Sequence, residues 1–251
     1  MVPPLPSTPG GNVLPEVDAY LFDIDGTLLN VSDATHYFAF LNAMRSVFGV
    51  ECNLDGVPVH GNTDVGILRA SLAQSGVSDE LFVSRIGQAM EQMCAEVVRN
   101  AADLRAVPCS SVRVLLEHLH GAGRLMGIVT GNLEAIGWAK LRAAGLQDFF
   151  HFGCFSGPLA NVAETSSPAM LERRVDILKL GVEEVKRRLG ADATVCAVGD
   201  TPRDIEAARD LGIPIVAVAT GIYSVDQLQK LGPDLCVRSC EEIEGFPFHG
   251  R

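Results

Sequence analysis

Four aspartates come at the ends of two short apolar segments of the chain. Asp23 and Asp25 close the first segment, and Asp200 and Asp204 follow the second. Carboxylates around one point repel, and each raises the pKa of the others unless a cation lies among them. Ligands that are all oxygen favour Mg²⁺ over zinc, and Mg²⁺ in proteins commonly binds substrate phosphate as well. The four acids therefore predict a magnesium site that serves phosphate chemistry.

A third apolar segment leads into Thr130, Gly131 and Asn132. The turn from a strand into a helix exposes free N–H groups at the positive end of the helix dipole, and these suit phosphate oxygens. Thr130, Gly131 and Asn132 are thus predicted to bind the phosphate of a substrate. In an open parallel sheet, ligands bind outside the carboxyl ends of the strands. The three segments, distant in sequence, should therefore meet in one crevice.

Short apolar segments alternate with helical patterns through much of the chain. The predicted strands are residues 19–25, 125–130, 194–198, 214–219 and 235–237, and the predicted helices are 110–120, 132–144, 170–189 and one that begins at Thr201-Pro202. Such alternation implies right-handed βαβ units and a mainly parallel sheet, so the predicted fold class is α/β with a Rossmann-like core. Residues 153–169 are rich in Gly, Ser, Pro and Asn and are predicted to be a long loop.

Residues 31–105 show helical periodicity with no convincing strand. Gly49 is predicted to end one helix, and Ser78 to begin another. We interpret this stretch as an all-helical cap, inserted after the first strand, that excludes water from the crevice. The predicted division is a flexible N-terminal arm (1–16), an α/β core (17–30 and 106–251) and the cap (31–105).

Composition narrows the classes of function. The 251 residues carry 20 Lys and Arg against 31 Asp and Glu, a formal net charge of −11, which argues against nucleic acid or an anionic membrane as a partner. The seven cysteines include no CxxC pair, so we expect a reducing setting and no structural zinc. The sequence shows neither a signal peptide nor an apolar run long enough to cross a membrane. We expect a cytoplasmic protein, either a monomer or a homodimer.

The motifs FDIDGTLL, VTGN and VGDTPRD, in that order, resemble those of the haloacid dehalogenase superfamily of aspartate-nucleophile phosphohydrolases. The likeness covers residues from about 18 to 240. Two longer segments, TGNLEAIGWAKLRAAGL and GDTPRDIEAARDLGIP, are similar to whole helices of the phosphoglycolate-phosphatase-like branch, which has a helical C1-type cap.

This resemblance implies a role for each acid. Asp23 would attack phosphorus to form an aspartyl-phosphate, and Asp25 would protonate the leaving oxygen and then activate the hydrolytic water. Thr130 would bind the phosphoryl group. Asp200 would bind Mg²⁺ together with Asp23 and the backbone carbonyl of Asp25, and Asp204 would be a further ligand or would support the others.

Members of the family also carry a basic residue that holds the nucleophile and the phosphate. In many of them it belongs to a Lys-Pro pair before the third motif, and this sequence has no such pair there. Arg174 lies 26 residues before Asp200 (200 − 174) and is the residue we choose for this role. Arg173 and Lys140 are the alternatives.

Residues 60–64, His-Gly-Asn-Thr-Asp, lie inside the predicted cap and allow two interpretations. One is a turn between helices in which Thr63 or Asp64 caps the helix that follows. The segment is also similar to a Gly-x-Thr-Asp motif in the caps of related phosphatases. That likeness implies that Thr63 and Asp64 face the crevice and bind the substrate.

The predicted function is a Mg²⁺-dependent phosphatase that hydrolyses a small phosphorylated metabolite. Two alternatives stay open on the same fold: a phosphomutase of the β-phosphoglucomutase type and a non-catalytic binding protein. A dehalogenase would work without Asp25 or a metal, so Asp25 argues against that reaction. A phosphonate hydrolase would need a cap lysine for a Schiff base, and residues 31–105 contain none.

Overall fold

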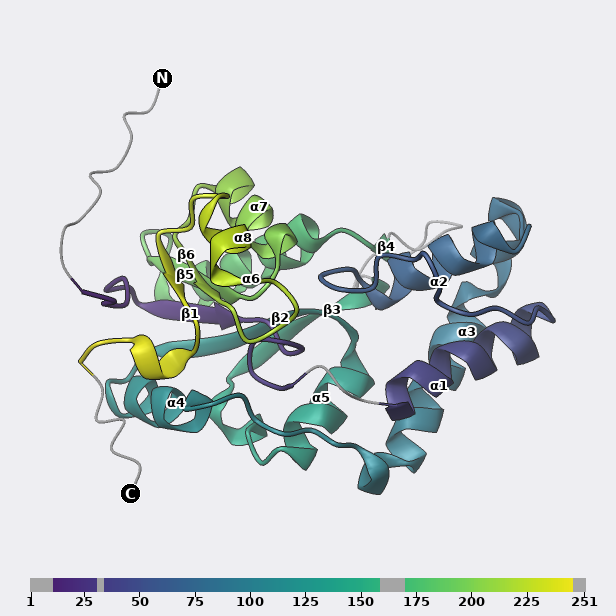
Figure 1. The fold of residues 1–251 in the computed structure, drawn as a ribbon, viewed down its shortest axis with the longest axis horizontal. Helices are drawn as coiled ribbons and strands as arrows, with labels where there is room; N and C mark the ends of the chain where they lie inside the picture. The colour runs from purple at the N-terminus through teal and green to yellow at the C-terminus, as the bar shows by residue number, and fades with distance from the viewer. Residues whose placement is uncertain (1–10, 31–33, 159–169, 246–251) are drawn as a thin grey trace.

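The computed structural model describes residues 11–30, 34–158 and 170–245, and within them seven strands form one sheet (Figure 1). The strands are β1 (Ala19–Phe22), β2 (Leu125–Leu133), β3 (Phe152–Pro158), β4 (Met170–Leu171), β5 (Val195–Gly199), β6 (Ile215–Val218) and β7 (Leu235–Val237). Their order across the sheet is β4-β3-β2-β1-β5-β6-β7, and every neighbouring pair is parallel except β3 and β4. The predicted α/β fold class is confirmed.

Strand β1 lies at the centre of this sheet. All four of its residues are buried, as expected for a short apolar run covered on both faces. Phe22 pairs with Ile128 of β2 on one side and with Val198 of β5 on the other. Later strands of the chain thus lie on both sides of β1. A ligand crevice is expected at the carboxyl end of a strand where the sheet order reverses in this way.

Helices cover both faces of the sheet. They are α4 (Val112–Gly121) and α5 (Glu134–Ala143) on one face, and α6 (Arg174–Leu189) and α7 (Pro202–Leu211) on the other (Figure 1). Tyr20 and Phe22 of β1 belong to the hydrophobic cluster that includes Leu116 of α4. Ala19 and Leu21 belong to the cluster that contains Ile177 of α6. This alternation along β1 places the sheet between two apolar layers. Short elements α8 (Val225–Gln229), η3 (Gln147–Phe149) and η4 (Cys240–Glu242) complete this part.

The described residues of 34–105, here called the helical insertion, contain helices and no strand. They are α1 (Ala34–Ala43), the π-helical turn η1 (Met44–Phe48), α2 (Asp64–Gln74), α3 (Asp79–Arg99) and the 3₁₀ turn η2 (Ala101–Asp103). Gly49 ends η1 in a left-handed conformation, and the Ser78 hydroxyl caps α3, both as predicted. The insertion has a hydrophobic cluster of its own, which extends to Ile136 and Ala139 of α5. In Figure 1, α1, α2 and α3 stand together at one end of the molecule.

The prediction of a long loop over 153–169 is wrong for its first part, because β3 covers residues up to Pro158. Gly153 and Gly157 made this segment resemble a loop. Pairing with β2 and burial of Phe155 against the core determine its structure instead, since strand formation depends more on packing than on local preference. Residues 159–169 lie outside the described residues.

Strand β2 is also longer than predicted and ends at Leu133, so α5 begins at Glu134 rather than at Asn132. Its pairing with β3 shifts between Val129 and Leu133, an irregularity of the strand at residues 130–132 that is here called the bulge.

Two further expectations lie partly outside the described residues. Of the predicted arm, residues 1–10 are not described, whereas the Asn12 carbonyl accepts a hydrogen bond from the Glu244 N–H at 2.7 Å and Leu14 packs against the core. Of the predicted cap, residues 31–33 are not described. Among the described residues, none of the helices has the length and apolar character that crossing a membrane requires.

Candidate active site

A cavity of about 180 Å³ lies between the carboxyl ends of β1, β2 and β5 and the helical insertion. The sheet side contributes Asp23, Asp25, Thr130, Gly131, Asn132, Lys140, Asp200 and Thr201, and the insertion contributes His36, Tyr37, Phe40, Leu54, Val59, His60, Gly61, Asn62, Asp64 and Ile67. The structure thus brings most of the sequence-predicted site residues together in one place. Of the others, Arg174 and Asp204 lie directly behind Asp23, and Thr63 does not line the cavity.

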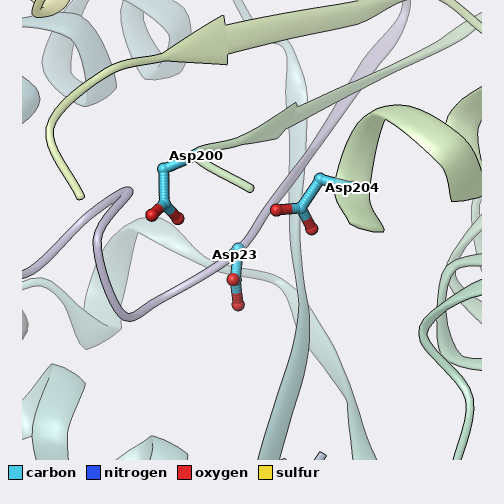
Figure 2. A group of neighbouring side chains, drawn as sticks. All are labelled: Asp23, Asp200 and Asp204. Atoms are coloured by element: carbon cyan, nitrogen blue, oxygen red, sulfur yellow. The ribbon is translucent and has the colours of Figure 1, made fainter. Parts of the chain in front are cut away.

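Three buried aspartates form the acidic cluster of this site (Figure 2). One carboxylate oxygen from each of Asp23, Asp200 and Asp204 lies within 4.8 Å of the others. Asp200 Oδ1 accepts a hydrogen bond from the Thr27 hydroxyl at 2.9 Å. Gly26 has a positive φ of 85°, and a Cβ there would stand 2.2 Å from Asp200 Oδ2. Only glycine therefore lets the loop after β1 pass this close to Asp200.

The carboxylates of this cluster repel one another, and burial makes their negative charges costly. Burial raises the pKa of Asp23 to about 6; the Arg174 guanidinium lowers it, and the carboxylates of Asp204 and Asp25 raise it. Burial, together with Asp204 and Asp23, also holds the pKa of Asp200 well above its ordinary value. A cation among these oxygens would remove that repulsion. The donors are all carboxylate oxygen, which fits a hard ion such as Mg²⁺.

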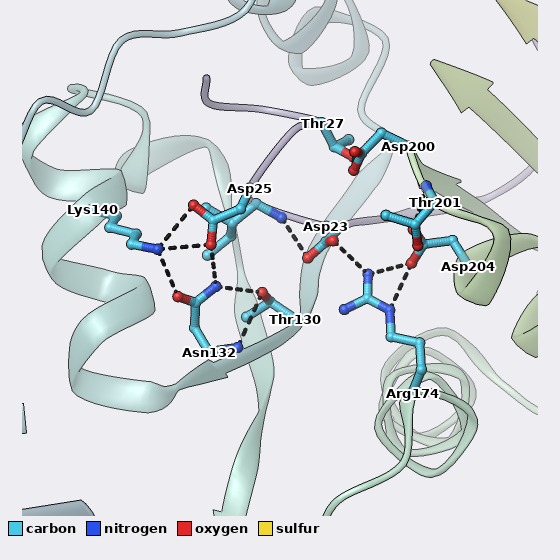
Figure 3. A network of polar contacts seen from close by, with 11 residues as sticks. Asp23, Asp25, Thr27, Thr130, Asn132, Lys140, Arg174, Asp200, Thr201 and Asp204 are labelled. Atoms are coloured by element: carbon cyan, nitrogen blue, oxygen red, sulfur yellow. Dashed lines mark hydrogen bonds and ion pairs between the residues drawn. The ribbon is translucent and has the colours of Figure 1, made fainter. Parts of the chain in front are cut away.

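Arg174, the first residue of α6, is buried behind the cluster. Its Nη2 lies 3.0 Å from Asp23 Oδ2 and 2.5 Å from Asp204 Oδ1, and its Nε donates to the same Asp204 oxygen at 2.6 Å (Figure 3). The two alternatives for this basic position lie elsewhere: the Arg173 side chain is 71% exposed and pairs with Asp176, and Lys140 pairs with Asp25. Among the three, Arg174 is the one that contacts Asp23.

Asp204 is also the N3 residue of α7. Its Oδ2 accepts a hydrogen bond from the Thr201 N–H at 3.0 Å, and the Thr201 side chain faces the Asp204 N–H in return, which forms a capping box. The Thr201 hydroxyl also donates to Asp204 Oδ2 at 2.7 Å. Since Arg174 occupies Oδ1, both oxygens of Asp204 have protein partners. This arrangement suits a residue that supports the metal ligands, and direct ligation by Asp204 stays a prediction.

Asp25 points away from Asp23 and toward α5 (Figure 3). Lys140 Nζ lies 2.9 Å from Asp25 Oδ1 and 2.7 Å from Oδ2, and the Asn132 amide donates to Oδ2 at 2.8 Å. Burial raises the pKa of Asp25, but the Lys140 ammonium and these hydrogen bonds outweigh it and hold that pKa below its ordinary value. The Asn132 amide also donates to the Thr130 hydroxyl at 2.8 Å, so the Asn132 side chain connects Thr130 with Asp25.

The predicted cap residues have protein partners. Thr63 is the N-cap of α2: its hydroxyl accepts from the Gly66 N–H at 3.0 Å and donates to the Glu172 carbonyl at 2.8 Å. Asp64 lines the cavity, where its Oδ2 accepts from the Leu133 N–H at 2.8 Å and lies 3.2 Å from His36 Nε2. The helix-cap interpretation is confirmed for Thr63, and substrate binding by Thr63 and Asp64 stays a prediction.

Gly131 is where the insertion meets the sheet. A Cβ at this position would stand 2.2 Å from the Asn62 carbonyl oxygen, so a side chain here would push the two parts of the chain apart. The absence of a side chain gives Gly131 a packing role in addition to its predicted role near the phosphate.

Sequence reasoning missed two features of the site. One is that Lys140 pairs with Asp25; the available signal was its spacing of four from Ile136, which places a lysine on the buried face of α5. The other is that His36, Tyr37 and His60 line the cavity. No local motif marks His36 or Tyr37, whereas His60 directly precedes the Gly-x-Thr-Asp segment.

Two relatives named as phosphatases match most of the chain. A phosphoglycolate phosphatase from Xanthomonas campestris pv. campestris is 33% identical over 81% of this chain and 83% of its own. A probable phosphatase, IndB, from Dickeya dadantii is 27% identical over 90% of this chain and 91% of its own.

Solved structures show the same fold. CbbY from Rhodobacter sphaeroides, in complex with xylulose-(1,5)bisphosphate, is 18% identical with a TM-score of 0.63 over 89% of this chain and 95% of that one. A β-phosphoglucomutase from Clostridium difficile is 16% identical with a TM-score of 0.59 over 89% of this chain and 92% of that one. The family model of haloacid dehalogenase-like hydrolases matches residues 17–212, most of the chain. The chain therefore belongs to the haloacid dehalogenase-like hydrolases, as its three motifs predict.

Proposed function

We propose that this chain is a Mg²⁺-dependent phosphatase that hydrolyses a small phosphorylated metabolite through an aspartyl-phosphate on Asp23. The observation that carries the proposal is the buried pair of Arg174 with Asp23, beside Asp200 at the base of the cavity. An aspartate that is held by a guanidinium and faces a cavity is suited to attack phosphorus. The relatives named as phosphatases support the class of reaction.

In the first half of the reaction an Asp23 oxygen attacks phosphorus, and the bond between phosphorus and the leaving oxygen breaks. Asp23 is fixed for this step, because its Oδ1 accepts from the Ile24 N–H at 2.7 Å and its Oδ2 faces Arg174. The pKa of Asp25 is held low in the free site, so Asp25 takes up a proton from solvent once the phosphate is bound; it then gives this proton to the leaving oxygen, which departs as an alcohol. The Thr130 hydroxyl and the N–H groups of the bulge bind the phosphoryl oxygens.

In the second half Asp25, now ionised, takes a proton from a water whose oxygen attacks phosphorus. The bond between Asp23 and phosphorus breaks, inorganic phosphate leaves, and the Asp23 carboxylate is restored. The residues that would hold Mg²⁺ are Asp23, Asp200 and the backbone carbonyl of Asp25, with Asp204 as a supporting residue. When bound, the ion supplies positive charge that offsets the charge of the phosphate and the carboxylates.

The helical insertion acts in this proposal as a cap over the core of residues 17–30 and 106–251. It supplies ten of the residues that line the cavity, on the side where the leaving group would lie. Tyr37, Phe40, Leu54, Val59 and Ile67 make much of this wall apolar, and the imidazoles of His36 and His60 add polar groups. A compact leaving group with few charges suits such a wall.

The same wall favours a phosphatase over a phosphomutase. A sugar phosphomutase of this kind must hold a sugar bisphosphate intermediate, and its second phosphate is usually bound by Arg or Lys. Of the described residues that line the cavity, Lys140 is the one Lys or Arg, and it is paired with Asp25. We therefore propose a substrate with a single phosphate.

A panel of phosphorylated metabolites, including 2-phosphoglycolate and sugar phosphates, tests this function. We expect release of inorganic phosphate with Mg²⁺, none in excess chelator, and none from an Asp23→Asn variant. Phosphorus NMR of the products separates hydrolysis from transfer of the phosphoryl group within a sugar. Full activity in chelator, or an isomerised sugar phosphate as the main product, would overturn the proposal. A protein that binds these compounds without turnover would instead be the non-catalytic binding protein.

A further inference from the structure

Lys140 is a charged side chain in the interior of the molecule. Its side chain is only 4% exposed, although a lysine on a helix surface normally extends into water. An ammonium group at such a place is costly unless charged and polar partners surround it. The partners of Lys140 are the two carboxylate oxygens of Asp25, at 2.9 and 2.7 Å, and Asn132 Oδ1 at 2.9 Å.

The Asp25 side chain is 31% exposed and also lines the cavity. Lys140 and Asn132 therefore hold the carboxylate from one side, and the other side stays open to the leaving group. Asn132 uses one amide group for two contacts, because Nδ2 donates both to Asp25 Oδ2 and to the Thr130 hydroxyl at 2.8 Å. The position of Asp25 is thus coupled to that of the residue proposed to bind the phosphoryl group.

Two separate cation–carboxylate pairs flank the place where the phosphoryl group would react (Figure 3). Arg174 contacts Asp23 at 3.0 Å, and Lys140 contacts Asp25 at 2.7 Å. Within the described part of the chain, Lys140 forms no hydrogen bond or ion pair with Asp23, and Arg174 forms none with Asp25. The two cations therefore serve different steps of the reaction.

We propose that Lys140 is a positioning residue that holds the Asp25 carboxylate, through direct contact and through Asn132, at the leaving-group side of the cavity. This inference rests on the proposed function, in which Asp25 delivers the proton to the leaving oxygen. Attack by Asp23 does not depend on Lys140. Loss of Lys140 must then slow the departure of a leaving group that needs a proton, and much less the departure of one that does not.

The test compares two substrates in single-turnover experiments, which follow the release of the first product and so isolate the first half of the reaction. One is p-nitrophenyl phosphate, whose nitrophenolate leaves without a proton. The other is the best alkyl phosphate from the metabolite panel. For Lys140→Met we expect release of the alcohol to slow by about 10²-fold, the low end of general acid catalysis, and release of nitrophenolate by less than about 10-fold. Lys140→Arg should recover part of the loss on the alkyl substrate.

Two control variants accompany this measurement. Arg142→Met removes an exposed cation from the same helix and should leave both rates unchanged. Arg174→Met removes the partner of Asp23 and should slow both substrates by similar factors. If Lys140→Met does not fold, Lys140→Gln takes its place, because the shorter neutral amide removes the ammonium and should give the same direction of change with a smaller ratio.

The outcomes separate this inference from the proposed function. Equal slowing of both substrates by a folded Lys140 variant, or no slowing, overturns the positioning role while the phosphatase function stands. A wild-type protein that releases phosphate from no substrate, or an Asp23→Asn variant that stays active, overturns the proposed function itself. A greater loss on the alkyl substrate, with recovery in Lys140→Arg, supports the positioning role.

Discussion

Arg174 Nη2 lies 3.0 Å from Asp23 Oδ2, and both side chains are buried. Asp23 directly follows β1 and Arg174 begins α6, 151 positions later in the chain (174 − 23), so the fold itself brings them together. The segment before Arg174 also contacts the helical insertion: the Thr63 hydroxyl donates to the Glu172 carbonyl, and Arg69 Nε and Nη2 contact the Glu172 carboxylate at 2.9 and 2.8 Å. The residues that surround Asp23 are therefore tied to the insertion as well as to the sheet.

Arg174→Met should damage both stability and activity. Removal of one partner from a buried ion pair typically costs about 3–5 kcal/mol, because the other charge stays buried without compensation. We expect a lower free energy of unfolding in denaturant titrations and a kcat reduced by at least about 10²-fold, similar to the loss of a preorganised charge in other active sites. Arg173→Met is the matched control, since its side chain is largely exposed. Equal effects of the two variants would contradict the assignment of Arg174.

Asp23→Asn keeps the shape of the side chain and removes the attacking charge. Turnover should fall to background, and the melting temperature should not fall, because the pKa of Asp23 is raised and its charge is already costly in the folded protein. Mass spectrometry of the wild-type protein, quenched in acid during turnover, should locate a phosphoryl group on the peptide that contains Asp23. A phosphorylated serine or threonine, or a variant with substantial activity, would rule out the aspartyl-phosphate.

The acidic cluster predicts how the stability of the metal-free protein depends on pH. The pKa of Asp23 is about 6, and that of Asp200 is also raised, whereas in the unfolded chain both lie near 4. Between these values the folded protein binds more protons than the unfolded one, so these two groups make stability fall as the pH rises from about 4 through 6. Mg²⁺ should offset the loss, since it binds the ionised carboxylates and requires their protons to leave.

Thermal melts of wild type and Asp200→Asn in chelator and in Mg²⁺ check this linkage. In chelator at pH 7.5 we expect the variant to be more stable than wild type, with a difference that shrinks at pH 4.5. Mg²⁺ should raise the melting temperature of wild type at pH 7.5 and leave that of the variant nearly unchanged. A variant that is less stable than wild type in chelator at both pH values would refute the proposed repulsion among the acids.

Sequence patterns located most of the site because its residues follow apolar strands. Asp23 and Asp200 directly follow β1 and β5, and Thr130 lies near the carboxyl end of β2; a parallel sheet with β1 at its centre brings these strand ends together. The pairing of Lys140 with Asp25 spans 115 residues and depends on which face α5 presents to the sheet. Neither the bulge at 130–132 nor strand β3 has a clear local signal, because both arise from pairing between β2 and β3. What could not be predicted is therefore whatever depends on contacts between elements, including strand β3 itself.

Thr63 and Asp64 are neighbours in the chain with different surroundings. We therefore expect the loss of the Thr63 hydroxyl to change stability, and the loss of the Asp64 charge to change substrate specificity. Thr63→Ala removes the hydroxyl that caps α2 and contacts Glu172, but that hydroxyl does not line the cavity. We expect a stability loss of about 0.5–2 kcal/mol, typical of a lost N-cap, with the same ranking of substrates.

Asp64→Asn keeps an oxygen for the Leu133 N–H and removes the negative charge that lies beside His36 and lines the cavity. It should change the relative kcat/KM of the natural substrates by about 1–3 kcal/mol in transition-state free energy, and that of p-nitrophenyl phosphate far less, because this small aryl ester makes few contacts with the insertion. Melting temperatures, together with kcat/KM for two substrates, distinguish a role in stability from a role in specificity. An Asp64→Asn variant that prefers the same substrates in the same order as wild type would show that Asp64 only links the insertion to β2.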